Sequence, residues 1–133
     1  MNSQEALSLI KDYISSWKNN DFNLIASSLH NQCTVIESHG PIYHGLNDIK
    51  SWFDFWLAAD SKILKWDLTS YYFCHHETTA FIEWEFECIS NNTTYPLSGI
   101  SLIKFLDNKI IHIHEYRMTK AAFDWDRKRL VSD

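Results

Sequence analysis

A chain of 133 residues is long enough for one domain with a substantial core, and we predict a single domain over residues 1–133. Hydrophobic residues make up 45% and aromatic residues 15% of the sequence, which excludes a disordered chain. The net charge of −5 provides no basic surface, so we expect no nucleic-acid partner, and no apolar stretch is long enough for us to expect a membrane span.

The beginning of the chain and its cysteines favour a cytoplasmic protein. The opening residues, MNSQEALSLIKDY, lack the basic segment and apolar run of a secretion signal. Cys33, Cys74 and Cys88 are odd in number and lie singly in predicted strands. We therefore expect reduced, buried thiols that serve as packing.

Three helices are predicted in the first half of the chain. Asn2 and Glu5 form a capping pair before a helix over residues 3–18, and Asp21 caps a short second helix. A third helix is predicted over residues 48–59. The apolar face of the first helix is Leu7, Ile10, Ile14 and Trp17, and that of the third is Ile49, Trp52, Phe53, Trp56 and Leu57.

Two strands are predicted around the third helix. Residues 33–38 form a short strand with Cys33, Val35 and Glu37 on one face, and residues 39–45 (HGPIYHG) form a loop. Residues 63–75 form the next strand, which ends in a turn at His75-His76-Glu77. Its apolar face is expected to be Leu64, Trp66, Leu68 and Tyr72.

The stretch from residue 81 to residue 116 predicts three long antiparallel strands. Residues 81–88 alternate apolar and acidic side chains, while residues 98–106 are apolar on both faces and predict a strand covered on both sides. In residues 110–117, Ile111, Ile113, Glu115 and Arg117 share one face. The turns are expected at Asn91-Asn92, with Pro96 nearby, and at Asp107-Asn108.

The predicted element order is ααβαββββ, which indicates an α+β fold. We expect a cone-shaped, curved antiparallel sheet packed on three N-terminal helices, with a hollow between the layers. The tail over residues 120–133 docks on the body or is flexible, and Phe123 and Trp125 favour docking.

This order and several short segments resemble the nuclear-transport-factor-2-like superfamily, and within it the SnoaL-like group, over residues 3–119. The segments that carry the resemblance are DFNLI at 21–25, VIESHG at 35–40 with Tyr43 and Gly45 beyond it, Trp52-Phe53, Glu83-Trp84, Gly99-Ile100-Ser101, and the last strand from Lys109-Ile110 to Glu115-Tyr116. The superfamily includes isomerases, cyclases, dehydratases, epoxide hydrolases and non-catalytic binding modules, so the resemblance implies the fold and leaves the activity open.

The resemblance also implies positions for catalytic groups. The strand before the Gly-Pro loop is similar to the one that carries the general base of ketosteroid isomerases, which matches Glu37, with Ser38 as the alternative at that position. SnoaL-type cyclases carry an acid just after the last aromatic residue, where this chain has Arg117, so Glu115 is a near match. The Arg between two Asp residues of limonene-type epoxide hydrolases is absent.

The candidate catalytic residues are Glu37, His39 and Glu115. A carboxylate among apolar side chains has its pKa raised by desolvation, which suits a general acid or base near neutral pH. The structural alternative is that each glutamate pairs with a buried donor. His39 and His44 flank the Pro41 loop, where they either relay protons or are surface histidines without a role.

We predict no metal site, because His112 and His114 have no third ligand at a recognisable spacing. The aromatic residues are either plain core or the wall of a ligand pocket. In the second case the substrate-binding residues are Trp17, Trp52, Trp56, Tyr72, Trp84, Phe86 and Ser101.

The sequence thus predicts a protein that binds a small apolar molecule and needs no cofactor. Its hypothetical activity is acid–base isomerisation, dehydration or cyclisation, with Glu37 as the base. The alternative is a non-catalytic homodimeric binding or regulatory module of the same fold. In either case we expect a homodimer through the outer sheet face, with Ile100, Leu102, His112, His114 and Tyr116.

Overall fold

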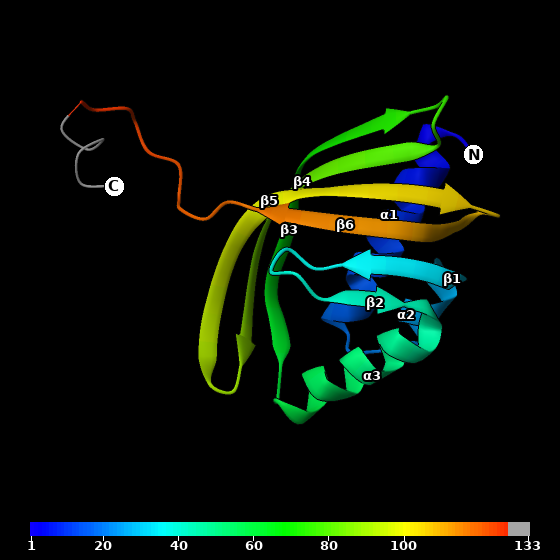
Figure 1. The fold of residues 1–133 in the computed structure, drawn as a ribbon, viewed down its shortest axis with the longest axis horizontal. Coiled ribbons are helices and arrows are strands. Elements are labelled where there is room, and N and C mark those ends of the chain that lie inside the picture. Colours follow the sequence, from blue (N-terminus) through cyan, green and yellow to red (C-terminus); the bar gives the residue numbers. More distant parts are fainter. Residues whose placement is uncertain (128–133) are drawn as a thin grey trace.

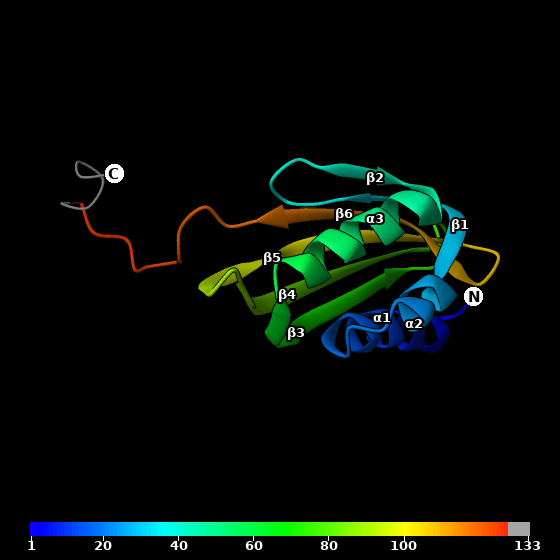
Figure 2. The same ribbon diagram turned by 90° about the horizontal axis from the view of Figure 1, so that it is seen from below.

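A computed structural model describes residues 1–127 of the chain. It contains three helices, α1 (Ser3–Lys18), α2 (Phe22–Ser28) and α3 (Gly45–Ala58). The strands are β1 (Leu29–Ile36), β2 (Ile42–His44), β3 (Lys62–Cys74), β4 (Thr79–Ser90), β5 (Thr93–Leu106) and β6 (Lys109–Arg117). The long strands β3 to β5 bend midway, and the sheet curves around the helices (Figures 1 and 2). The predicted α+β architecture is therefore confirmed.

The six strands form one sheet in the order β2-β1-β6-β5-β4-β3. Strands β4 to β6 form the predicted antiparallel meander, and β3 pairs with β4, also antiparallel, at its edge. Strand β1 instead pairs with β6 in parallel, which the prediction of a wholly antiparallel sheet did not include. This parallel pair joins the N-terminal half of the chain to the meander.

The first two helices begin where their capping residues predict. The backbone N–H of Glu5 donates to Asn2 Oδ1 at 2.8 Å, and Asn2 Nδ2 donates back to Glu5 Oε1 at 3.0 Å. The N–H of Leu24 donates to Asp21 Oδ1 at 3.2 Å. Helix α1 has the predicted bounds, and its apolar face lies on the core.

The region around the Pro41 loop differs from its prediction. Strand β1 begins at Leu29 and ends at Ile36, and the expected loop contains a strand, β2, that pairs with β1. Helix α3 begins at Gly45 instead of residue 48, and the N–H of His44 before it donates to Asp48. The observed order is thus ααββαββββ.

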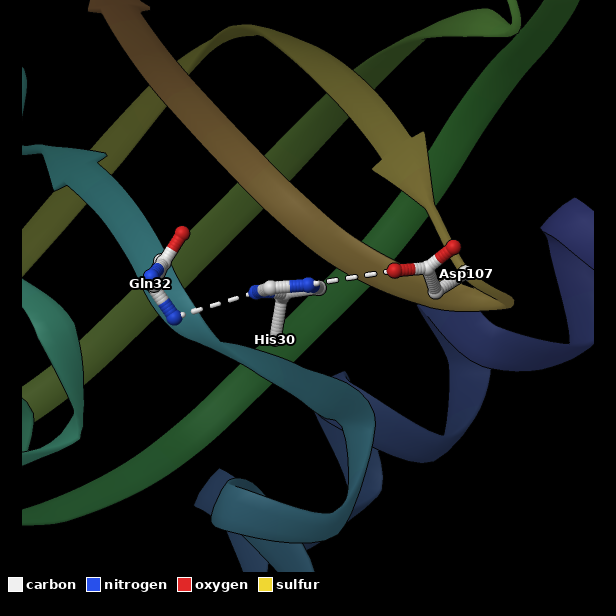
Figure 3. Close-up of polar contacts among 3 residues, drawn as sticks. All are labelled: His30, Gln32 and Asp107. Carbon is white, nitrogen blue, oxygen red and sulfur yellow. Dashed lines mark hydrogen bonds and ion pairs between the residues drawn. The ribbon is translucent and has the colours of Figure 1, made fainter.

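The irregular start of β1 is held by His30. The register between β1 and β6 shifts between Leu29 and Thr34, which leaves backbone groups there without regular strand partners. His30 Nδ1 accepts from the N–H of Gln32 at 3.0 Å, and its Nε2 lies 3.5 Å from Asp107 Oδ2 (Figure 3). The side chain therefore connects this part of β1 to the β5–β6 turn.

Strand β4 has the predicted orientation throughout. Ile82, Trp84 and Cys88 are buried, whereas Glu83 and Glu85 face solvent. The Trp84 indole, only 5% exposed, donates to Ser101 Oγ on β5 at 2.8 Å.

Strand β3 does not have the predicted strict alternation, because a bulge interrupts it near its start. Ile63 pairs with Cys88 and Lys65 with Glu87, so Leu64 is an extra residue. Before the bulge, Ile63 is buried and Leu64 is exposed, opposite to the expected faces, whereas Trp66 and Leu68 after it pack on the core as predicted.

A second bulge, at Thr69, reverses the faces of the residues that follow it. After it, Tyr71 and Phe73 pack on the core, while Tyr72 is 65% exposed and Cys74 is exposed. The predicted inward position of Tyr72 and the predicted burial of Cys74 are therefore wrong.

A bulge in β6 changes a third expected face. The register shifts between Lys104 and Phe105, so Ile110 and Ile113 are buried and Ile111 is not. The outer face of β5, with Ile100 38% exposed, is not covered within the described chain, contrary to the prediction of a strand covered on both sides.

Both hairpin turns of the meander consist of two residues, as predicted. Asn91-Asn92 and Asp107-Asn108 all have positive φ, between 49° and 61°, which is typical of type I′ turns. Pro96 lies within β5 and not in a turn. Its missing N–H is tolerated because pairing with β6 begins only at Gly99.

After Arg117 the chain runs away from the sheet (Figure 1), and Trp125 is 69% exposed. Residues 128–133 of the expected tail lie outside the described part. Within residues 1–127, no helix is long and apolar enough to cross a membrane.

Replacement of Trp84 by Ala should destabilise the fold strongly. The change removes a large buried ring and leaves the Ser101 hydroxyl without its donor, so we expect a loss of roughly 3–5 kcal/mol in the free energy of unfolding. Urea denaturation measures this loss, with Glu85→Ala on the outer face as a control that should change by less than about 0.5 kcal/mol. A loss below about 1 kcal/mol for Trp84→Ala would contradict the observed packing.

Candidate functional site

A cavity of about 420 Å³ lies between the helices and the inner face of the sheet. Most of its wall is aromatic or aliphatic, and two carboxyl groups interrupt this wall. Its lining residues are Tyr13, Trp17, Glu37, Ser38, His39, Trp52, Trp56, Ile63, Trp66, Trp84, Phe86, Cys88, Tyr95, Leu97, Glu115 and Arg117.

Glu37 is the first residue after β1, not part of the strand as predicted. Its backbone N–H donates to Pro41 O at 3.0 Å, and its carbonyl accepts from the N–H of Gly40 at 3.0 Å. These bonds close the loop tightly at the end of the strand. The loop thus holds Glu37 at the cavity wall.

The Glu37 carboxylate has two polar neighbours. The Tyr43 hydroxyl, from β2, donates to Glu37 Oε1 at 2.5 Å, and His39 Nε2 lies 3.9 Å from the same oxygen. Tyr43 is held in place because its ring stacks on Trp52, with centroids 4.3 Å apart and 5° between the planes. Burial raises the pKa of Glu37, whereas the Tyr43 hydrogen bond and the charge of His39 partly offset this rise.

Glu115 reaches the same cavity from β6. Burial raises its pKa, with a further contribution from the charge of Glu37, to about 8. Within residues 1–127, no side chain makes a hydrogen bond or ion pair to its carboxyl group. Glu115 is therefore a carboxylic acid that keeps its proton at neutral pH.

The parallel pairing of β1 with β6 explains why the two glutamates meet. Ile36, the last residue of β1, is in register with His114. Continuing this register by one residue places Glu37 beside Glu115. The charge of Glu37 contributes to the raised pKa of Glu115, so the two carboxyl groups interact electrostatically.

Gly99 on β5 permits the close approach of β6 beside this site. A Cβ atom there would lie 2.0 Å from the backbone oxygen of Tyr116 and 2.9 Å from the Cα of Arg117. Any other residue at this position would push away the end of β6 that carries Glu115. Gly99 therefore helps to set the position of the second carboxyl group.

The aromatic wall of the cavity is built from contacts between rings. Trp17 packs against Trp52 and Trp56, with centroid distances of 4.5 and 6.0 Å. Trp66 and Phe86 meet edge to face at 5.5 Å. The rings support one another and leave the cavity open between them.

The structure brings most of the predicted site residues to this cavity. The three candidate catalytic residues Glu37, His39 and Glu115 line it, as do Trp17, Trp52, Trp56, Trp84 and Phe86. Tyr72 does not, because the bulge in β3 turns it outward, and Ser101 lies behind Trp84 as its hydrogen-bond acceptor. His44 is exposed at the end of β2, outside the cavity wall.

Several lining residues were absent from the predicted site. Tyr13 could have been found, because it lies one helical turn before Trp17 on the same face of α1. Tyr95 and Leu97 come from the far end of β5, which only the curvature of the sheet brings over the cavity. Among residues 1–127, no group of His, Cys, Asp and Glu has the arrangement of a metal site.

The fold and this cavity define a class of protein, an α+β domain whose curved sheet encloses an aromatic-lined hollow with carboxyl groups. Residues 10–113 match the family model described as SnoaL-like domain, and the chain belongs to this family. The resemblance noted in the sequence is thus confirmed. No curated protein matches the sequence.

Solved structures of the same fold share little sequence with this chain. A candidate polyketide cyclase from Xanthomonas campestris pv. campestris is 15% identical, with a TM-score of 0.71 and coverage of 99% of this chain and 98% of its own. An LEH-like epoxide hydrolase from M. tuberculosis is 10% identical, with a TM-score of 0.75 and coverage of 86% and 84%.

A protein with a ketosteroid isomerase-like fold from Catenulispora acidiphila, solved in complex with trimethylamine, is 15% identical, with a TM-score of 0.67 and coverage of 81% and 83%. These likenesses concern the fold alone.

The stability of the protein should depend on pH through Glu115. Because its folded-state pKa is raised from 4.5 to about 8, its contribution to stability is fully present below pH 4.5 and is lost as the pH rises through about 8. The raised pKa of Glu37 acts in the same direction. We expect the free energy of unfolding to fall over this range, and Glu115→Gln to reduce the fall.

The measurement is urea denaturation at several pH values, together with NMR titration of the Glu115 side-chain carboxyl carbon. The exposed Glu77→Gln serves as a control and should retain the wild-type pH dependence. A Glu115 carboxyl that titrates near its ordinary value of 4.5 would contradict the desolvated position described here.

Proposed function

We propose that the protein binds a small, largely apolar molecule in the cavity and transforms it by acid–base chemistry without a cofactor. The observation that carries this proposal is the pair of interacting carboxyl groups in one aromatic-lined cavity, each in a different environment. Isomerisation, dehydration and cyclisation all fit such a pair.

The different environments assign the two roles. Glu37 accepts a hydrogen bond from Tyr43 and lies near His39, and both favour its ionised form, so it is the base. Glu115 has no such partner and keeps its proton, so it is the acid. Two carboxyl groups whose pKa values are separated in this way are a common arrangement for proton transfer at neutral pH.

In an isomerisation, the Glu37 carboxylate removes a proton from a carbon next to a carbonyl group, and the electron pair moves into the carbonyl to form an enolate. The enolate then takes a proton at another carbon, and Glu37 returns to its ionised state. In a dehydration, Glu37 removes a proton from carbon, the electron pair forms a carbon–carbon double bond as the C–O bond breaks, and Glu115 donates its proton to the hydroxyl group, which leaves as water. Transfer of the proton from Glu37 to Glu115 then restores both groups. Each step balances with the groups that line the cavity.

The alternative is a non-catalytic binding module of the same fold. That function would fit best if the aromatic side chains filled the hollow. Trp52, Trp56 and Phe86 line an open volume instead, which supports the enzymatic proposal.

Glu37→Gln should retain the fold and lose turnover or weaken the binding of compact carbonyl and phenol compounds. The amide keeps the size of the side chain but cannot accept a proton as a carboxylate does. An NMR fragment screen on the wild type and on this variant, with Glu77→Gln as a control, measures the effect. If no fragment shifts cavity resonances and Glu37 titrates like a free glutamate, the binding-module alternative is correct.

We also propose that two copies associate through the outer face of the sheet. The helices cover the other face, while Ile100 and Tyr116 remain exposed on this one. The Tyr116 ring stacks on the His114 ring, with centroids 4.1 Å apart, and a hydrogen bond also links the two side chains. The two rings therefore add an aromatic surface to this face. Such a patch favours a protein partner over solvent.

Light scattering on a sizing column should give about twice the chain mass of 15.7 kDa. Ile100→Glu should shift the protein toward a monomer, because it places a charge in the apolar contact, whereas the control Glu77→Lys should not. A wild-type monomer at all micromolar concentrations contradicts this proposal.

The three cysteines form no disulfide, which fits a reducing compartment, and we propose a cytoplasmic location on this ground.

A further inference from the structure

Within residues 1–127, Arg117 is the only lysine or arginine that lines the cavity. It is the last residue of β6 and lies two residues after Glu115, so the alternation of the strand directs both side chains to the same face. Both residues belong to the cavity wall, and Arg117 is exposed. The cavity thus carries a positive charge at its open side.

The topology of the sheet leaves Arg117 without a side-chain partner on the neighbouring strands. The residue opposite it on β5 is Gly99, which has no side chain. On the other side of β6, the pairing with β1 ends at His114, before Arg117 is reached. Within the described chain, the guanidinium makes no hydrogen bond or ion pair, although Glu37 and Glu115 line the same cavity. Its charge is therefore available to a ligand.

Further hydrogen-bond donors come from the loop between β1 and β2. This loop lies beside the end of β6 in both views of the fold (Figures 1 and 2). Its residues Ser38 and His39 line the cavity, and the His39 side chain is 53% exposed. A hydroxyl and an imidazole can each donate a hydrogen bond to an anion. Polar donors thus occupy the open side, whereas the buried Trp17 and Trp84 form part of the inner wall.

We propose that Arg117 binds a carboxylate group of the ligand, so that the substrate is a ring compound bearing one carboxylate. This inference concerns the same cavity as the proposed function and rests on it. The parallel N–H groups of a guanidinium match the two oxygens of a carboxylate. One cation balances one negative charge, and a doubly charged group such as a phosphate would be repelled more strongly by the Glu37 carboxylate.

The position of Arg117 also fits the proposed proton transfer. Two residues along a strand place the Cα atoms of Arg117 and Glu115 roughly 6–7 Å apart. A ring attached to a carboxylate at Arg117 therefore reaches Glu115 and the aromatic wall while the carboxylate stays at the open side. Binding at both ends fixes the orientation of the ring, which brings the reacting carbon to the carboxyl groups.

The test compares three compounds with the same ring system, namely 2-naphthoate, the neutral 2-naphthamide and the cationic 2-(aminomethyl)naphthalene. We expect the wild-type protein to bind 2-naphthoate about tenfold or more tightly than 2-naphthamide at neutral pH, as measured by NMR titration. Added NaCl should weaken the binding of 2-naphthoate and leave that of 2-naphthamide unchanged. The Arg117 Nε–H signal should shift with 2-naphthoate and not with 2-naphthamide.

Arg117→Met should reduce the preference for 2-naphthoate to within about twofold, because the side chain keeps its length and loses its charge. Lys104→Met is the matched control, since it removes the same charge from an exposed position outside the cavity wall. This control should keep the wild-type ratio of affinities, which separates a local effect from one of net charge. The Arg117 signal of the wild type tests the same point if a variant fails to fold.

Equal affinity for 2-naphthoate and 2-naphthamide, tighter binding of the amine, binding of none of the three compounds, or a preference that survives Arg117→Met would overturn the inference. If carbonyl and phenol fragments still bind and depend on Glu37 in that case, the proposed function stands without it.

The affinity ratio is also measured in Glu37→Gln, where the loss of a negative charge should maintain or increase it. A ratio that persists there, while Glu37→Gln changes neither turnover nor fragment binding, would refute the acid–base proposal and leave the assignment of Arg117 standing.

Discussion

The parallel pairing of β1 with β6 is the constraint on which the rest of this structure depends. It joins the helical half of the chain to the antiparallel meander, and its register places Glu37 next to Glu115. Because parallel strands run in the same direction, Glu37, just after the end of β1, lies beside Glu115, near the end of β6. Gly99 keeps this edge compact, since any side chain there would displace the end of β6. The two carboxyl groups therefore meet through backbone geometry, and not through a bond between their side chains.

Two carboxyl groups in an aromatic cavity lower the stability of the fold. The structure offsets this loss differently for Glu37 and for Glu115. Glu37 receives a hydrogen bond from Tyr43, whose ring is in turn held by Trp52. Glu115 lacks such help and remains protonated, which avoids the larger cost of two adjacent charges. The same division supports the proposed roles of Glu37 as base and Glu115 as acid.

The sequence by itself determined the caps of α1 and α2, the alternation in β4 and the two-residue turns of the meander, because each depends on residues close together in the chain. It also indicated Glu37 and Glu115 as the carboxyl groups of interest. Only the tertiary structure decided that Tyr72 faces outward and that β1 pairs with β6 in parallel. One extra residue in a strand reverses every face that follows it, and a bulge arises from pairing with a distant strand. Such features have no local signature, since their energies depend on contacts between residues far apart in the chain.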